Sequence, residues 1–532
     1  MTANNTSSRS LASIAGIVAV ATLISKVFGL VRQQIIAAAF GVGDVVNAYA
    51  YAYVVPGFLL ILLGGVNGPF HSALVSALSK RDKSEAAPIV ETVSTLVTLF
   101  LLLVTIIVIV FAGTFIDLSG PELSPEVRDI AILQLRIMAP IALLAGLIGI
   151  GFGTLNAADS YLLPSLSPLF SSVAVVIALG ALIWHAGEQL NTPQYIQIGA
   201  ITLAGATLAG AILQWLAQLI AQWRSGLGTL KLRFDWRIPG VMDVLRVMFP
   251  ATLSSGMLQI NVYTDLFFAS GIAGAAAAMQ YANLIALTPL GILENMILVP
   301  FLPVFSRLAA PENWPELKLR IRQAIFLGAL TMLPLTAIFM SLALPIVKLI
   351  YQRAQFDSDA SNFVAPLLMT YGLGMFFYFA RDVLLRVFYA LGDGETPFRI
   401  SIINIFLNAI LDYFLVQAFA APGLVLATIG VNITSVVIFI WLLHRRLNKL
   451  PLLAWSKEIF ALVIASAIAG LISWGISHGF EQFIGSDNLL LLLIELSVST
   501  VIALSIFILI AMQLKVPELK MLTNTIKKKI RK

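Results

Sequence analysis

The sequence predicts an all-α integral membrane protein with about fourteen transmembrane helices, arranged as two six-helix lobes followed by two C-terminal helices. Of its 532 residues, 59% are apolar and only 11% are charged, a balance that water-soluble domains do not have. The apolar runs recur along the whole chain at lengths of about 20 residues or more, enough for a helix to cross a bilayer. They lack the short alternating pattern that is typical of a membrane β-barrel.

The apolar runs are separated by short loops that are polar or rich in glycine and proline. Pro56, Gly64-Gly65 and Pro69 fall inside the second run and predict a bend or a break there. Pro289 and Pro300 predict a similar break in the eighth. The expected segments cover about residues 11–40, 45–78, 88–117, 130–155, 160–185, 195–222, 239–270, 275–305, 324–350, 362–391, 399–419, 423–444, 456–480 and 488–514.

The distribution of basic residues predicts the orientation of the chain. The strongly basic loops follow segments two, six, eight, twelve and fourteen, which all end on one side of the membrane if the segments alternate. The opposite loops hold few cations, chiefly Arg128 and Arg353. Because cytoplasmic loops are enriched in Lys and Arg, both termini are expected in the cytoplasm. The net charge of +6 is therefore a topology signal and predicts no nucleic-acid partner.

A repeat relates the two halves of the chain. Residues near positions 40–76 recur, with similar spacing of tyrosine, proline and phenylalanine, near positions 270–306. The offset is an even number of segments, so both halves insert in the same orientation, as in transporters built from parallel repeats. This predicts an N-terminal lobe at 1–225, a second lobe at 226–450, and the last two helices with a basic tail at 451–532.

Two cations interrupt the first apolar segment. A charged side chain near the bilayer centre costs about 2.5–3.5 kcal/mol on the insertion scale, so Lys26 and Arg32 are expected to face water, a partner or a ligand. With Gly29 between them they step by three residues, and their side chains can converge on one cavity. The predicted anion site comprises Ser25, Lys26, Gly29 and Arg32. The alternative is that the cations extend to the membrane surface.

A second set of polar residues lies in the later segments. Asn408 and Asp412 share one helix face, being four residues apart. With Asp265 and Thr428 they form a set of hard oxygen ligands suited to an alkali cation, and hydrogen bonds between helices are the alternative. Glu294 follows Pro289 and is expected either to face the cavity or to pack as a protonated side chain.

The sequence carries no recognised catalytic motif. It has no phosphate-binding glycine-rich loop, no His-Glu-x-x-His and no Gly-x-Ser-x-Gly, each of which would indicate a specific chemistry. It has no cysteine, which excludes disulfides and thiolate metal sites. We therefore expect a transporter without a covalent cofactor and not an enzyme. A membrane-embedded glycosyl or polyprenyl transferase is the remaining enzymatic alternative.

Four motifs resemble the MurJ/MviN family of lipid II flippases, in the multidrug/oligosaccharidyl-lipid/polysaccharide exporter superfamily, and the resemblance covers essentially the whole chain. The motifs are Ser25-Lys26-x-x-Gly29-x-x-Arg32, Ala39-Phe40-Gly41, Tyr281-Ala282 with Pro289, and Phe388-Tyr389-Ala390-x-x-Asp393-x-x-Thr396-Pro397.

The resemblance implies a function in peptidoglycan biosynthesis, and hence in cell shape, at the bacterial inner membrane. The chain would flip the undecaprenyl-pyrophosphate-linked precursor, lipid II, to the outer leaflet by alternating access. Cations in the cavity, with Glu294 beside them, would contact the headgroup, and segments thirteen and fourteen would hold the lipid tail. The family's sodium site matches Asp265, Asn408, Asp412 and Thr428, with a backbone carbonyl at Leu424. A monomer in contact with membrane lipids is the simplest expectation.

The chain departs from the family pattern at several cavity positions. The first-segment arginine of the family is Lys26, which keeps the charge but loses the two-pronged donor geometry. The arginine expected in segment two falls within Phe58-Leu59-Leu60-Ile61-Leu62, and the one in segment eight falls at Leu284. The cavity is therefore less cationic than the family's. A flippase for another polyprenyl-linked saccharide, or a sodium- or proton-coupled exporter of small molecules, stays open as an alternative.

Overall fold

The regular structure of the chain is helical. The computed structural model describes residues 11–64, 69–79, 81–228, 230–238, 240–257, 260–485, 488–514 and 517–519, and among these no β-strand occurs. Backbone amides inside a bilayer have no water to bond, so a chain this apolar satisfies them within helices. The chain divides into two compact units, unit 1 (Met1–Ala277) and unit 2 (Ala278–Lys532).

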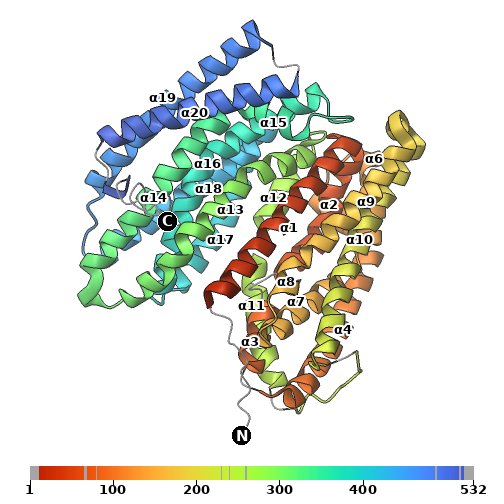
Figure 1. Ribbon diagram of the computed structural model, residues 1–532. Helices are drawn as coiled ribbons and strands as arrows, with labels where there is room; N and C mark the ends of the chain where they lie inside the picture. Colours follow the sequence, from red (N-terminus) through yellow and green to blue (C-terminus); the bar gives the residue numbers. More distant parts are fainter. Residues whose placement is uncertain are drawn as a thin grey trace. The chain divides into compact units, whose positions relative to one another are not determined.

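Unit 1 contains the helices that are coloured red to yellow-green in Figure 1. Ser124 caps one of them, α6, since its Oγ accepts a hydrogen bond from the backbone N–H of Val127 at 3.3 Å. The elements are α1 (Leu11–Phe40), α2 (Asp44–Gly64), α3 (Pro69–Leu78), α4 (Lys83–Val110), α5 (Ala112–Ser119), α6 (Pro125–Met138), α7 (Ile141–Ala157), α8 (Leu162–Leu166), α9 (Pro168–Ala186), η1 (Gly187–Asn191), α10 (Pro193–Arg224), α11 (Val241–Met257) and α12 (Ile260–Ala269), followed by the start of α13 (Ala275–Arg307).

The helices of unit 1 pack around α2 and α7. Helix α2 lies against α6 and α7, while α9 lies between α1 and α10. Phe70, Leu74 and Val93 belong to a buried apolar core that α3, α4, α7 and α11 share. Helix α12 packs on α5, and the hydroxyl of Tyr51 on α2 donates to the carbonyl of Leu266 on α12 at 3.1 Å. This packing positions α1 and α2, which carry the predicted cations and their neighbours.

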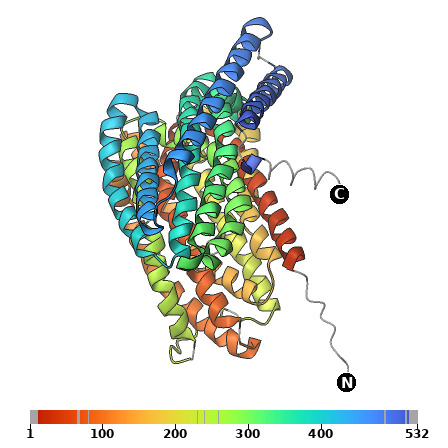
Figure 2. The same ribbon diagram turned by 90° about the vertical axis from the view of Figure 1, so that its left-hand side faces the viewer.

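Unit 2 is organised around α14 and α16. Helix α14 lies against α16 and α19, α16 lies against α18, and α17 pairs with α18. Helices α19 and α20 lie side by side, which both views show in blue (Figures 1 and 2). The elements after α13 are η2 (Pro311–Asn313), α14 (Trp314–Ser341), α15 (Ala343–Tyr351), α16 (Ser358–Ala390), α17 (Glu395–Phe419), α18 (Ala421–Arg446), α19 (Leu452–Phe483) and α20 (Leu489–Gln513).

The helices agree with the prediction of about fourteen membrane segments. Twelve helices of the described residues are long and apolar enough to cross a membrane, and α6 with α7, bent by 41°, gives a thirteenth candidate. Helices α11 and α12 occupy the expected seventh segment, with Leu258 and Gln259 outside the described residues. The expected division at 225/226 and 450/451 rests on the sequence repeat and stays a prediction.

The proline-rich segments were each expected to bend or break. In the second segment α2 continues through Pro56 and ends at Gly64, and α3 begins at Pro69. The break expected between them falls on residues 65–68, outside the described residues. The expected break in the eighth segment is wrong, because α13 continues from Ala275 to Arg307 with Pro289, Pro300 and Pro303 inside it. Membrane helices tolerate proline where neighbouring groups satisfy the freed carbonyls. A break that the sequence did not predict divides the ninth segment at Leu342, whose φ of −121° and ψ of 20° leave the helical region.

Candidate functional site

The predicted anion site lies on α1, in unit 1. The hydroxyl of Ser25 donates to the carbonyl of Ser165 on α8 at 3.2 Å, which fixes this turn of α1 against its neighbour. An added Cβ at Gly29 would meet no atom within 4 Å, so this turn faces open space. The side chain of Lys26 is exposed and that of Arg32 is half-buried. The segment therefore presents two cations that a ligand can reach.

Arg32 is the better candidate of the two for direct ligand binding. Its Nε is buried and has no hydrogen-bond partner among the described residues. A buried donor without a partner costs about 1–3 kcal/mol, and more where the group is charged. The guanidinium is close enough to Tyr49 and Tyr53 on α2 to act electrostatically on their phenol groups. Arg32 thus has a donor available at the boundary between protein and open space.

A pair of stacked tyrosines lies near Arg32, and the sequence analysis did not identify this pair. The rings of Tyr49 and Tyr53 lie 5.3 Å apart at an interplanar angle of 10°. The hydroxyl oxygen of Tyr49 lies 3.1 Å from Oγ1 of Thr207 on α10. The ring of Tyr53 covers Gly57, where a Cβ would come within 2.5 Å of it. The four-residue spacing of the two tyrosines predicts that they share one face of α2, but it does not show which face of α2 meets α1.

The positions where family arginines are missing have ordinary packing roles. Phe58, Leu59 and Leu60 on α2 pack against the apolar core of unit 1. Leu284 on α13 is half-buried and its carbonyl accepts a hydrogen bond from Thr288 at 2.6 Å. Glu294, the remaining predicted ligand residue, is half-buried on α13 in unit 2.

The predicted cation site is centred on the pair of helices α17 and α18 in unit 2. Asn408 and Asp412 are fully buried, and the amide Nδ2 of Asn408 donates to Oδ2 of Asp412 at 2.7 Å. The predicted sharing of one helix face is therefore confirmed. On α18, the hydroxyl of Thr428 donates to the carbonyl of Leu424 at 3.3 Å. Asp265, the fifth member of the predicted set, lies on α12 in unit 1.

A close helix crossing positions the Leu424 carbonyl. An added Cβ at Gly423 would lie 2.1 Å from the carbonyl oxygen of Leu415, so only glycine lets α17 and α18 approach here. The chain reverses through Ala420, whose φ is 53°. The crossing places the first turn of α18 beside the last turns of α17, which is where Asp412 lies.

Hydrogen bonds between helices, the alternative reading, also occur along this pair. The amide of Asn404 on α17 donates to Oγ of Ser435 on α18 at 2.9 Å. No group of three or more His, Cys, Asp or Glu side chains among the described residues is placed to hold a metal ion. A cation at this pair would therefore depend on amide, hydroxyl and carbonyl oxygens beside Asp412, a donor set that suits an alkali cation.

The Asp393 motif has a structural role. The carboxylate of Asp393 accepts from the N–H of Thr396 at 3.0 Å, from its hydroxyl at 2.9 Å, and from Nη1 of Arg446 at 2.8 Å. Burial alone would raise the pKa of this carboxyl, but the Thr396 hydrogen bonds and the Arg446 guanidinium lower it. The motif fixes the loop between α16 and α17 to the end of α18.

Comparisons with known proteins agree with one another. A family model described as lipid II flippase MurJ matches residues 36–494. A probable lipid II flippase MurJ from Synechocystis sp. is 61% identical over 532 residues, which is the full length of both chains. A lipid II flippase MurJ from Burkholderia cenocepacia is 27% identical over 483 residues, covering 88% of this chain and 89% of that one.

Solved structures share the fold. A lipid II flippase MurJ in an inward closed conformation superposes with a TM-score of 0.75 at 22% identity, covering 94% of this chain and 99% of that chain. An inward-facing multidrug resistance transporter of the MATE family has a TM-score of 0.62 at 17% identity, with 83% and 99% covered.

Proposed function

This chain belongs to the MurJ family of lipid II flippases, and we propose that Arg32 and Lys26 hold the pyrophosphate of lipid II while the protein carries it to the outer leaflet. The chain is a multi-pass membrane transporter and not an enzyme. The missing cavity arginines do not place it outside the family, since a full-length relative with 61% identity bears the same family name.

One observation carries the proposed role of α1. Nε of Arg32 is a buried donor that has no hydrogen-bond partner among the described residues, on a helix turn that faces open space at Gly29. A phosphate oxygen is the kind of acceptor that such a donor lacks, and a hydrogen bond between charged groups is about twice as strong as a neutral one. Lys26, one and a half turns away and exposed, adds a second charge. Together the two cations reduce the cost of moving a pyrophosphate dianion through a medium of low dielectric constant.

A cation bound at α17 and α18 would supply the coupling. The buried Asp412, the amide of Asn408 and the hydroxyl of Thr428 offer oxygens to sodium, and the family pattern adds the Leu424 carbonyl on α18. Sodium can bias alternating access only if it binds one conformation more tightly than the other. The basic loops favour a cytoplasmic location for both termini, and the transport that we propose runs from the inner to the outer leaflet.

The sidedness of lipid II tests this function. The protein is depleted in its host, and the fraction of lipid II accessible at the outer face of spheroplasts is measured. We expect the outer pool to fall while total lipid II rises, because synthesis continues at the inner face. An unchanged outer pool would contradict lipid II as the cargo and would favour another polyprenyl-linked saccharide.

A further inference from the structure

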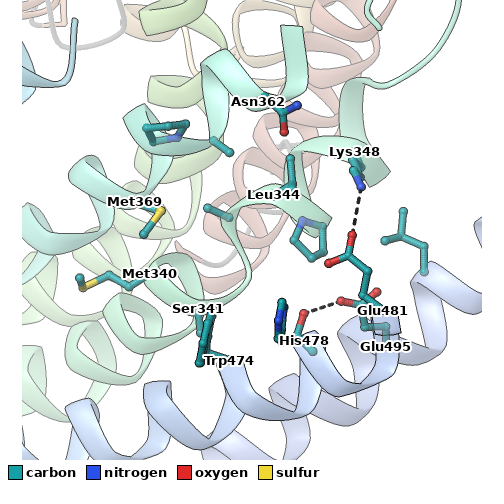
Figure 3. Close-up of a pocket in the computed structure, with 16 residues that line it drawn as sticks. Met340, Ser341, Leu344, Lys348, Asn362, Met369, Trp474, His478, Glu481 and Glu495 are labelled. Atoms are coloured by element: carbon teal, nitrogen blue, oxygen red, sulfur yellow. Dashed lines mark hydrogen bonds and ion pairs between the residues drawn. The ribbon is translucent and has the colours of Figure 1, made fainter. Parts of the chain in front are cut away.

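Unit 2 contains a polar cavity of about 370 Å³ that the proposed function does not use. It lies where the end of α14, with α15 and α16, meets α19 and α20, and Figure 3 shows its lining side chains. Its polar lining includes Ser341, Lys348, Asn362, His478, Glu481 and Glu495. Three charged residues in one cavity of a membrane protein need an explanation, since ionisable groups within membrane helices are usually functional.

Glu495 on α20 is the most deeply buried of these groups. Its side chain is 2% exposed, and it lines the cavity. One carboxyl oxygen, Oε1, accepts a hydrogen bond from the hydroxyl of Ser477 on α19, drawn as a dashed line in Figure 3. The other oxygen, Oε2, is buried and has no hydrogen-bond partner among the described residues. An ionised carboxylate in this position would be only half satisfied.

A second unsatisfied oxygen lies on the same face of α20. Ser499 is four residues after Glu495, fully buried, and its Oγ has no hydrogen-bond partner among the described residues. Residues four apart on a helix are neighbours on its surface. The seam between α19 and α20 therefore contains two adjacent oxygens, and no donor from the described protein reaches either one.

The charged groups around Glu495 do not neutralise it. From α15, Nζ of Lys348 pairs with Oε1 of Glu481 on α19, at 3.8 Å. From α19, the ring of His478 stacks on Trp474 at 5.3 Å, with Nε2 beside the amide of Gln482. Toward the other end of α14, Arg322 bonds to Glu458 on α19 and to Glu518, which follows α20.

We propose that Glu495 is a proton-binding site: it takes a proton from the cavity onto Oε2 and holds it there as a neutral carboxylic acid. The step is protonation alone, so one O–H bond forms and the negative charge of the carboxylate is removed. Protonation turns Oε2 into a donor, and water in the cavity can accept a hydrogen bond from it. It also removes the cost of a buried charge, which is large when no cation pairs with it.

A proton fits this site better than an alkali cation does. Sodium needs several oxygen ligands around it, whereas the described seam offers one free carboxyl oxygen and one serine hydroxyl. Water in the cavity can deliver a proton, and the cavity is large enough to hold several water molecules. On the topology that the basic loops predict, the α19–α20 loop lies on the non-cytoplasmic side, so the proton would come from that side of the membrane.

Infrared spectroscopy of the purified full-length protein tests the site directly. The carbonyl stretching band of a protonated carboxylic acid, recorded at about pH 7, should lose one component in Glu495→Gln. The matched control Glu395→Gln makes the same change at an exposed carboxylate on α17, 72% exposed and paired with Arg399, and should leave the band intact. Identical spectra for wild type and Glu495→Gln would overturn the proposal.

Thermal unfolding supplies a second measurement that does not depend on transport. If the folded protein keeps this proton and the unfolded chain releases it, the unfolding temperature of the wild type should fall as pH rises from about 5 to about 8. Glu495→Gln keeps an acceptor for Ser477 and should fold, with this part of the pH dependence lost. A wild type whose unfolding temperature does not change over this pH range would overturn the proposal. A sodium response that Glu495→Gln loses while Asp412 is intact would instead favour an alkali-cation site at Glu495.

Discussion

The charged candidate residues on α1 in unit 1 and those on α17 and α20 in unit 2 have opposite sign. In unit 1, helix α1 carries Lys26, whose side chain is exposed, and Arg32, whose side chain is half-buried. In unit 2, α17 and α20 bury Asp412 and Glu495, which are 0% and 2% exposed. Cations with available donors suit a phosphate, whereas buried carboxylates suit a sodium ion or a proton. On the proposed function, α1 would bind the cargo, and α17 and α20 would bind the small ions.

The difference in burial follows the size of the ligand. A pyrophosphate with a saccharide and a lipid tail can bind only where the protein surface is open, as it is around Gly29. A proton binds a single carboxyl oxygen and a sodium ion binds several oxygens, and water can carry either one to a buried group. Exposure and charge together therefore indicate which kind of ligand a candidate site in a membrane transporter binds.

The largest expected effect comes from Arg32→Ala. Loss of a charged hydrogen bond costs about 1.5–3 kcal/mol, which corresponds to about a 10- to 100-fold decrease in binding. The outer pool of lipid II should therefore fall as in depleted cells. Arg32→Lys should retain part of the function, because the charge stays but the planar donor geometry is lost.

The matched control is Arg399→Ala, which removes an arginine that is 72% exposed and paired on the helix surface with Glu395. It should leave the outer lipid II pool unchanged. If Arg32→Ala accumulates in the membrane and still supports a normal outer pool, α1 does not bind the headgroup.

The next effect in size concerns Asp412→Asn. If sodium binds at α17 and α18, it stabilises the wild type by about 2.7 kcal/mol at a concentration 100 times its Kd. The variant should lose this stabilisation, measured as the difference in unfolding temperature between sodium and choline chloride. Asp359→Asn makes the same change at an exposed residue of α16 and should keep the full response. A sodium response that is unaltered in Asp412→Asn would rule out the metal site.

A smaller effect is expected from Gly423→Ala. The new Cβ would lie 2.1 Å from the Leu415 carbonyl oxygen, and such overpacking costs about 1–3 kcal/mol. At Gly475 on α19 a Cβ meets nothing within 4 Å, so Gly475→Ala should stabilise the helix by about 0.5–1 kcal/mol. Thermal unfolding of the two variants compares them directly. Equal unfolding temperatures would show that α17 and α18 do not cross as closely as described.

The sequence predicted the features that depend on local pattern. Apolar runs of membrane-spanning length predicted the helices, and the four-residue spacing of Asn408 and Asp412 predicted their shared face, which the 2.7 Å hydrogen bond confirms. The family motifs predicted the family. These signals are short in range or recur along the chain, so they can be read without knowing which helices meet.

Features that depend on contacts between distant segments could not be predicted. Tyr49 lies near Arg32, and Ser477 bonds to Glu495, because particular faces of α1 and α2, or of α19 and α20, meet in the fold. Pro289 and Pro300 predicted a break in segment eight, yet α13 is unbroken, and α2 likewise continues through Pro56. Whether a proline breaks a membrane helix depends on neighbours that satisfy the freed carbonyl, and the sequence does not show these neighbours.

The smallest expected effect is that of Lys26→Arg. The substitution keeps the charge at an exposed position and restores the two-pronged donor. The free energy of headgroup binding should therefore change by about 0.5 kcal/mol at most, and the outer lipid II pool by no more than about twofold. Lys26→Met keeps the apolar stem and removes the charge, and it should lower the outer pool well below that of Lys26→Arg. If both variants have the outer lipid II pool of the wild type, the Lys26 side chain only extends to the membrane surface. Arg32 is then the single cation of α1 that binds the headgroup.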